Sequence, residues 1–353
     1  MVISRSGYLN AEVYRAPAEW ERHRCTWLAW PHNPDTFPEP ILWRVEQIYC
    51  EMIREISRGE AVKILVNDEA EEKRAERLLD QAGVNLSLIE FHHVVTVDVW
   101  VRDYAPIFVE RIDQGILCGI KWRFNAWGMK YADLALDDAA GREILRISGA
   151  MPVERGVVVE GGAIDLSGDG LLITTKECLL NPARNPGVSL EEVEAELKSF
   201  LGVEKVLWLE RGVVGDDTDG HVDVFCRFVA HDTLLLLKER REGVNRDILE
   251  KAAQRIEDFS FKSQRRLEVH RVPAPAPVKV MGQYVPASYL NFYISNSSVL
   301  VPLFGVPEDE EALATLEESF HHRRVIGIRC PELFYGLGGI HCVTMQQPET
   351  NSG

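Results

Sequence analysis

The chain has fewer basic than acidic residues, which argues against two large classes of partner. Its 39 Lys and Arg stand against 55 Asp and Glu, giving a formal net charge of −16. Nucleic acids and anionic membranes would repel such a chain, whereas a cationic ligand would be attracted to a negative cleft. The charge balance therefore predicts no nucleic-acid or membrane partner and is compatible with a cationic substrate.

Targeting and membrane-spanning segments are also lacking. The N-terminus, Met1–Arg5, does not show the succession of charged and apolar residues found in a signal peptide, and no apolar run could cross a bilayer. We therefore expect a cytosolic protein. Its 353 residues, 46% of them hydrophobic, can build a substantial core.

Cysteine pairs and several catalytic motifs are absent as well. The seven cysteines are odd in number and widely spaced, without a Cys-x-x-Cys pair, so neither a disulfide framework nor a zinc finger is indicated. There is no serine elbow, phosphate loop or His-Glu-x-x-His pair. Six cysteines are expected to be packing residues. Cys342 follows the flexible pair Gly338-Gly339, at the expected start of a strand beside His341, which would suit a thiol facing a cleft. This stretch alone, however, favours one more buried packing residue.

What the sequence does contain is a recurring order of helices and strands. Apolar spacing predicts helices over 41–58, 68–81, 132–148, 189–201, 244–259 and 309–320. Apolar or alternating strands are expected over 26–30, 61–66, 84–91, 116–122, 156–160, 171–177, 203–209, 233–239, 266–272, 299–304 and 324–329. A further strand bearing unusual polar residues is expected in each repeat, over 97–103, 161–166, 221–229, 289–295 and 340–346.

This repetition predicts an α/β fold with five units in a radial, propeller-like arrangement. An open doubly wound sheet ranks second, because the Gly-rich phosphate turn of a dinucleotide fold is missing. In a radial fold the equivalent ends of the five units meet at one axis. That arrangement would bring together Asp103, Glu160, His221, Asn291 and Cys342.

The individual polar residues leave structural alternatives open. His221 and Asp223 would project from one face of a strand, roughly 7 Å apart, either into a site or into solvent. Asp103 could hold a ligand or form a surface pair with Arg102. Glu160, at the end of a valine-rich strand, could serve a site or simply solvate the strand end.

One thiol among several carboxylates limits the substrate. Carboxylates raise the pKa of a neighbouring thiol and so oppose formation of the nucleophilic thiolate, unless the substrate is itself a cation. A guanidinium group meets this need, because its carbon can be attacked and its N–H groups pair with carboxylates. Neighbours on a strand face opposite sides, so His341, although adjacent, would face away from Cys342. Zinc bound by Cys, His and carboxylates is a weaker alternative.

Six motifs in sequence carry a family resemblance. They are Val99-Trp100-Val101-Arg102-Asp103, Asn125-Ala126-Trp127-Gly128, Glu160-Gly161-Gly162, Gly220-His221-Val222-Asp223, Ala287-Ser288-Tyr289-Leu290-Asn291-Phe292-Tyr293 and Gly339-Ile340-His341-Cys342. In this order, over about residues 18–348, the chain resembles the agmatine deiminase and bacterial-type peptidylarginine deiminase family.

The resemblance implies a fivefold pseudo-symmetric α/β propeller of the guanidino-modifying (pentein-like) enzymes, formed as a single catalytic domain over residues 1–353. It implies that Cys342 is the nucleophile and His221 the general acid and base, that Asp103 and Asp223 hold the guanidinium, and that Glu160 orients His221. It further implies substrate contacts by Trp100, Trp127, Asp217 and Asn291. No metal or organic cofactor is expected, and a homo-oligomer is plausible.

The substrate is open among three alternatives. Agmatine suits an acidic cytosolic protein, but Arg123, if it faced the pocket, would favour the carboxylate of free or peptidyl arginine. A propeller that binds guanidino ligands without catalysis is the third alternative. Two departures from the family pattern bear on the choice: Gly336-Leu337-Gly338-Gly339 precedes Ile-His-Cys, and Met129 stands where a second glycine is common.

Overall fold

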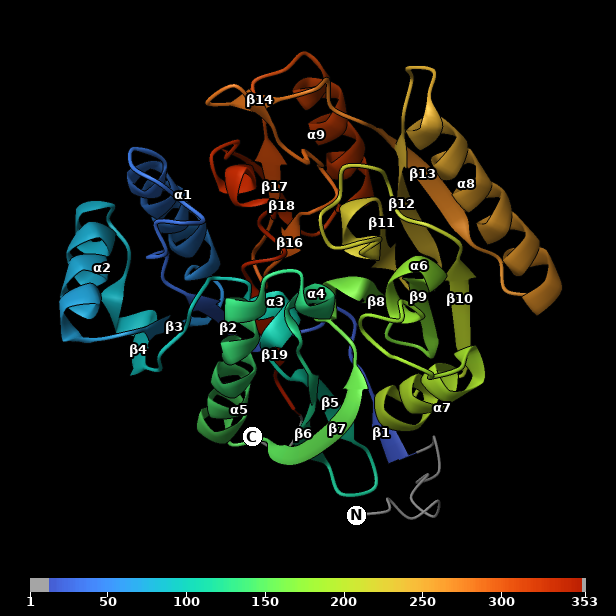
Figure 1. Ribbon diagram of the computed structural model, residues 1–353, viewed down its shortest axis with the longest axis horizontal. Helices are drawn as coiled ribbons and strands as arrows, with labels where there is room; N and C mark the ends of the chain where they lie inside the picture. Colours follow the sequence, from blue (N-terminus) through green and yellow to red (C-terminus); the bar gives the residue numbers. More distant parts are fainter. Residues whose placement is uncertain (1–12, 351–353) are drawn as a thin grey trace.

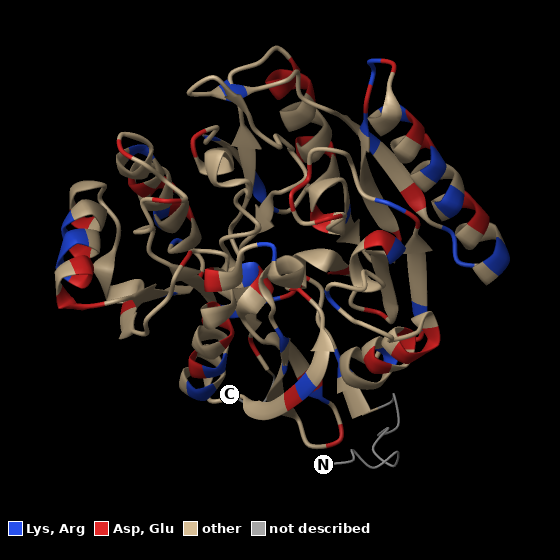
Figure 2. Cartoon of the chain, in the orientation of Figure 1, with Lys and Arg blue, Asp and Glu red and all other residues tan. Residues whose placement is uncertain are grey.

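Small sheets surround the centre of the molecule, and the longer helices lie at its periphery (Figure 1). The computed structural model describes residues 13–350, so the segment Met1–Arg5 lies outside the described residues. Within that range no helix has both the length and the apolarity needed to cross a membrane. Acidic and basic residues alternate along the outer helices rather than separating by sign (Figure 2).

Among residues 13–350, five sheets share one pattern of pairing. In each, a first strand is antiparallel to a second, the second is parallel to a third, and a helix connects the second to the third. Short edge strands extend two of these sheets. The repeat expected from the sequence is therefore present in the topology, and the single doubly wound sheet that ranked second is wrong.

Four of the units are continuous in sequence. The first contains β5 (Ile107–Arg111), β6 (Ile116–Arg123), α5 (Asp137–Ser148) and β7 (Met151–Val158), with β1 (Tyr14–Arg15) added beside β5. The second contains β8 (Ile164–Leu166), β9 (Leu171–Thr175), α6 (Lys176–Leu179), α7 (Leu190–Leu201) and β10 (Lys205–Leu209). The third contains β11 (Cys226–Ala230), β12 (Thr233–Lys238), α8 (Val244–Ser263) and β13 (Glu268–Pro273). The fourth contains β16 (Tyr293–Ile294), β17 (Ser298–Leu303), α9 (Glu308–Ser319) and β18 (Arg324–Arg329).

The fifth unit joins the two ends of the chain. It contains β19 (Met345–Pro348), β2 (His23–Ala29), α1 (Ile41–Ile56) and β3 (Ala61–Val66), followed by α2 (Glu69–Gln81) and β4 (Ile89–His93). A separate hairpin, β14 (Lys279–Val280) with β15 (Gln283–Tyr284), stands outside the five units. Because β19 pairs with β2, the segment that carries Cys342 is fixed against the first long strand of the chain.

The six predicted helices are confirmed, with changes at their ends. Ser189 and Glu192 exchange hydrogen bonds of 3.2 and 2.9 Å in the predicted capping box of α7, and Gly202 ends that helix in the left-handed region at φ 66°. The segment expected as one helix over 132–148 is a 3-10 turn followed by α5, and α8 continues to Ser263 rather than ending at 259.

Four of the five polar-bearing strands are present but begin later than predicted, as β8, β11, β16 and β19, and the strand predicted over 97–103 is absent. The strand begins only after the polar residue or is missing: 97–103 holds the short helix α3 (Val101–Tyr104), 161–163 and 222–224 are 3-10 turns, and residues 340–342 are a turn. Asp223 and His221 therefore do not share a strand face, and Cys342 does not begin a strand.

Side-chain acceptors explain these turns. The carboxylate of Asp137 accepts the N–H groups of residues 97 and 98 at 2.6 and 3.0 Å, and Asp216 accepts those of Gly220 and His221 at 2.8 and 3.0 Å. The N–H of His341 is bound by Asn291. These backbone donors are satisfied without a neighbouring strand, so alternation of residue type did not indicate a strand here.

Two buried apolar clusters support the units. The larger contains residues of β2, β3, α1, β12 and β17 together with Trp100, Trp127 and Cys342. The smaller lies among β6, β9, β10 and α7. The residues of the expected site are thus rooted in a close-packed core rather than in surface loops.

Candidate functional site

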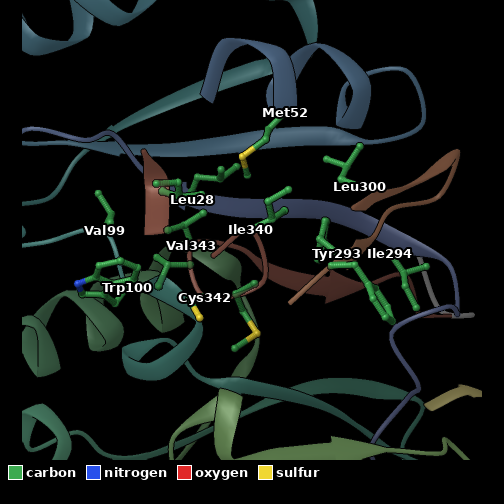
Figure 3. Packing of buried hydrophobic residues seen from close by; sticks show 14 of the residues in the cluster. Leu28, Met52, Val99, Trp100, Tyr293, Ile294, Leu300, Ile340, Cys342 and Val343 are labelled. Carbon is green, nitrogen blue, oxygen red and sulfur yellow. The ribbon is translucent and has the colours of Figure 1, made fainter. Parts of the chain in front are cut away.

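Cys342 opens onto a large cavity in the described part of the chain. The cavity has a volume of about 670 Å³ and is lined, beside Cys342, by Asp103, Trp100 and Trp127. Cys342 is 6% exposed, and its neighbours Ile340 and Val343 pack into the apolar cluster beside it (Figure 3). The thiol is therefore fixed by its neighbours and yet faces the cavity.

The turn before Cys342 depends on a close approach. A Cβ on Gly339 would lie 2.5 Å from Asn291 Oδ1 and 2.3 Å from the Phe334 ring, so no larger residue fits without a shift. Asn291 Oδ1 accepts the N–H of His341 at 3.0 Å and lies 3.4 Å from Cys342 Sγ. Asn291 thereby sets the position of the sulfur.

His221 lies between two carboxylates. Its Nδ1 is 3.9 Å from Asp103 Oδ1 and its Nε2 is 3.8 Å from Glu160 Oε2, and the ring is fully buried. Neither ring nitrogen has a hydrogen-bond partner among the described residues. Burial opposes protonation, but Asp103, the Cys178 side chain and Glu160 together raise the pKa of His221 well above its usual value. The His221 ring is therefore kept in its protonated form and can act as a general acid.

Glu160 is kept ionised by Arg184, a residue that the sequence did not indicate as part of the site. Arg184 Nε donates to Glu160 Oε1 at 2.8 Å, and both side chains are fully buried. Arg184 also binds Asp219 Oδ2 at 3.2 Å and the carbonyl of Thr218. Burial opposes ionisation of Glu160, but Arg184 and His221 lower its pKa to about 2. Glu160 therefore faces His221 as a carboxylate at neutral pH.

Asp103 is buried and doubly bonded rather than paired at the surface. Its Oδ2 accepts the indole N–H of Trp127 at 2.9 Å, and its Oδ1 accepts the N–H of Gly162 at 3.0 Å. Arg102 is also buried and donates to the carbonyl of His341 at 3.2 Å, so the surface-pair alternative is wrong. Burial raises the pKa of Asp103, while His221 acts in the opposite direction.

Asp223 is the second carboxylate of the site, and His341 binds it. His341 Nδ1 lies 2.7 Å from Asp223 Oδ2, whereas Asp223 Oδ1 has no partner among the described residues. Cys342 Sγ lies 4.0 Å from the same Oδ2. A Cβ on Gly162 would come within 3.1 Å of His221, Asp223 and Asp103, so these three polar groups converge on one glycine.

The five predicted anchor residues are thus brought together, but one expected site residue stands apart. Asp217 lies at the wall of the cavity, where its Oδ2 accepts the hydroxyl of Tyr131 at 2.8 Å and Lys130 pairs with it at 3.8 Å. Arg123 is exposed and does not line the cavity, so it is not placed to bind the carboxylate of an arginine substrate.

The cavity wall carries charge of one sign. Asp35, Asp98, Asp103, Asp133 and Asp217 line it, and no Lys or Arg does so within residues 13–350. Burial, then Asp223 and Asp103, raise the pKa of the Cys342 thiol well above its usual value. A cation entering the cavity would offset these carboxylates and favour the thiolate, as the sequence argument requires.

Glu160, Cys178 and His221 form the one group in the described range that could hold a metal. Their ligand atoms lie within 4.8 Å of one another, and all three residues are buried. A sulfur, a nitrogen and an oxygen would suit Zn²⁺. The guanidinium of Arg184, however, already pairs with Glu160, which places a fixed positive charge beside this group.

Comparisons with known proteins agree with this geometry. The family model described as Porphyromonas-type peptidyl-arginine deiminase matches residues 15–348. An agmatine deiminase of Ectopseudomonas mendocina is 35% identical, with 96% of each chain covered. The solved agmatine deiminase of Enterococcus faecalis has a TM-score of 0.86 at 29% identity, with 96% of each chain covered. An agmatine deiminase of C. jejuni solved with substrate bound, at 23% identity and a TM-score of 0.86 over 99% of each chain, shows the shared fold.

Proposed function

The chain belongs to the Porphyromonas-type peptidyl-arginine deiminase family, and we propose that it is an agmatine deiminase that converts agmatine and water into N-carbamoylputrescine and ammonia. The observation that carries this proposal is the cavity, where the Cys342 thiol and the buried carboxylate of Asp103 stand in a wall lined by aspartates and by no Lys or Arg among the described residues, with Asp223 4.0 Å from the sulfur. Agmatine is a dication without a carboxylate, which suits that wall, whereas arginine would bring its negative carboxylate toward the aspartates.

In this proposal Asp103 and Asp223 bind the guanidinium, and its positive charge stabilises the Cys342 thiolate. The thiolate adds to the guanidinium carbon. His221, as imidazolium, then gives its proton to the leaving nitrogen, so that the C–N bond breaks and ammonia departs from a covalent amidino-thioether. Glu160 stabilises the positive charge of the His221 imidazolium before this transfer.

The second half of the reaction restores the enzyme. His221, now neutral, takes a proton from a water molecule that attacks the same carbon. The C–S bond breaks, the Cys342 sulfur leaves as thiolate, and the ureido product is released. The side chains named here supply the nucleophile and the acid and base, so the scheme includes no metal or organic cofactor.

Trp100 and Trp127 are assigned to the substrate's aliphatic stem because both line the cavity next to Asp103. Asn291 is assigned to Cys342, which it contacts at 3.4 Å. The repeated strand order of the five units supports the finer proposal of a fivefold pseudo-symmetric propeller, and the pairing of β19 with β2 supports a single domain. A cytosolic location and a homo-oligomer stay predictions.

Substrate preference tests the proposal directly. Ammonia release should be compared for agmatine, free arginine and a peptide with a C-terminal arginine, at equal concentrations. We expect the highest kcat/KM for agmatine, because both other substrates carry a carboxylate into an acidic cavity. Preference for the peptide would reject agmatine as the substrate and leave the deiminase chemistry in place, whereas binding without ammonia release from any of the three would favour a non-catalytic ligand-binding protein.

Asp217 is proposed to attract the distal ammonium of agmatine. Replacing Asp217 with Asn is expected to raise KM roughly two- to fivefold with little change in kcat, since the carboxylate is partly exposed and screened. Steady-state kinetics at two ionic strengths would check this, because the difference from the wild type should shrink as salt is added. An unchanged KM would remove Asp217 from the substrate site.

A further inference from the structure

We propose that His341 is a positioning residue for Asp223, one of the two carboxylates proposed to bind the substrate's guanidinium. Its imidazole ring, bridging Glu19 and Asp223, fixes one oxygen of Asp223 and leaves the other directed to the substrate's guanidinium. This inference rests on the proposed function, because it concerns how the same site binds its cation. His341 itself is not assigned contact with the substrate.

The two ring nitrogens of His341 each face a carboxylate. Nδ1 lies 2.7 Å from Asp223 Oδ2 and Nε2 lies 2.8 Å from Glu19 Oε2, and the ring is 2% exposed. A neutral imidazole donates from one nitrogen only, whereas the imidazolium donates from both. The ring is therefore held between two carboxylates, with one nitrogen directed to each.

The far side of the ring is rigidly held. Glu19 Oε2 also accepts from Arg227 Nη2 at 3.0 Å, and Glu19 Oε1 accepts the N–H of Ile294 at 2.8 Å. Arg227 in turn stacks on the Phe292 ring, 4.5 Å from its centroid. Glu19 cannot move away from His341 without breaking these buried contacts, so it serves as a fixed support.

Other charged groups near the ring keep this arrangement in place. Arg102, from α3, donates to the His341 carbonyl and lies 3.7 Å from Glu19. Arg227, from β11, pairs with Asp165 of β8 as well as with Glu19. His341 is thus surrounded by Asp223, Glu19, Asp165, Arg102 and Arg227, and no titratable side chain of the described residues other than Glu19 and Asp223 pairs with its ring.

Asp103 provides an internal comparison for Asp223. Both are buried carboxylates of the same site, but Asp103 accepts only neutral N–H groups, from Trp127 and Gly162. Burial raises the pKa of Asp103; for Asp223 burial acts in the same direction, but the hydrogen bond and charge of His341 outweigh it and lower the pKa. The unpartnered oxygen Oδ1 is consequently a charged acceptor with no ligand among the described residues.

A pair of amide variants separates positioning from packing. The amide nitrogen of Asn lies near the place of Nδ1, and that of Gln lies near the place of Nε2, so His341→Asn keeps a donor to Asp223 and His341→Gln keeps a donor to Glu19. We expect His341→Gln to lower kcat/KM for agmatine roughly 10- to 100-fold, mainly through KM, and His341→Asn to lower it less.

The pH profile gives a second readout. Loss of the donor raises the pKa of Asp223, so the acid limb of kcat/KM should move to higher pH in His341→Gln, and less in His341→Asn. His270→Gln, on β13 and partly exposed, is the matched control and should leave both KM and the limb unchanged. If His341→Gln does not fold, Glu19→Gln, which keeps an acceptor oxygen but removes the charge, should move the limb in the same direction.

The outcomes distinguish this inference from the function on which it rests. Equal losses in the Asn and Gln variants with an unmoved acid limb would show a packing role and overturn the positioning role. Wild-type protein that releases no ammonia from agmatine would instead overturn the proposed function. Agmatine affinity measured by calorimetry on His341→Gln in a Cys342→Ala background should fall by the same factor as KM rises.

Discussion

Cys342→Ala is expected to lower ammonia release from agmatine roughly 10⁴- to 10⁶-fold, because the nucleophile that forms the covalent intermediate is lost. Substrate binding should survive, since Asp103 and Asp223 remain in place on other elements. Cys342→Ala removes a single sulfur atom from a side chain that is 6% exposed, so the fold should be retained with a small loss of stability. Single-turnover ammonia assays and calorimetry with agmatine would measure the two properties separately.

Cys330→Ala is the matched control for that variant. Cys330 is also a free, buried thiol, and it belongs to the same apolar cluster, but it does not line the cavity. Its replacement should lower the stability slightly and leave kcat near the wild-type value. Wild-type turnover in Cys342→Ala would end the thiolate scheme, and comparable losses in the two variants would point to damaged packing instead.

The repeat and the residues at its centre could be predicted because each rests on local sequence. The helices follow apolar spacing and capping residues, such as Ser189 with Glu192. Asp103, His221 and Cys342 each lie shortly before the first strand of a unit, the first, third and fifth, and so at equivalent ends. The turns that hold these residues could not be predicted, because their backbone donors bind distant carboxylates and amides rather than a neighbouring strand.

The groups that support the site escaped prediction for a related reason. Arg184 lies in the loop Asn181-Pro182-Ala183-Arg184-Asn185-Pro186, whose local sequence suggests an ordinary exposed turn. Its burial follows from Asn125, which donates to the Ala183 carbonyl at 3.1 Å and ties this loop to the Trp127 turn. The proposed role of His341 could not be predicted either, because a turn rather than a strand sets the direction of its side chain.

Arg184→Met should have the largest effect on stability. It removes the cation from a fully buried pair and leaves the buried carboxylate of Glu160 with only His221 beside it, and breaking such a pair typically costs about 3–5 kcal/mol. The pKa of Glu160 is about 2 in the wild type, against 4.5 for the free group, so the pair contributes its full stabilisation above pH 4.5 and loses it as the pH falls toward 2. The difference in unfolding free energy between wild type and variant, measured by urea unfolding, should therefore become smaller as the pH falls from 4.5 toward 2.

Combining Arg184→Met with Glu160→Gln separates the structural and the catalytic parts of this pair. The double variant has no buried charge left at the pair, so it should regain much of the stability that Arg184→Met loses. Ammonia release should not return, because His221 then lacks the carboxylate 3.8 Å from Nε2 that favours its imidazolium. Because the double variant would be stable and inactive, its loss of ammonia release could be assigned to the acid and base step. If stability and ammonia release both recovered, Glu160 would serve only the fold.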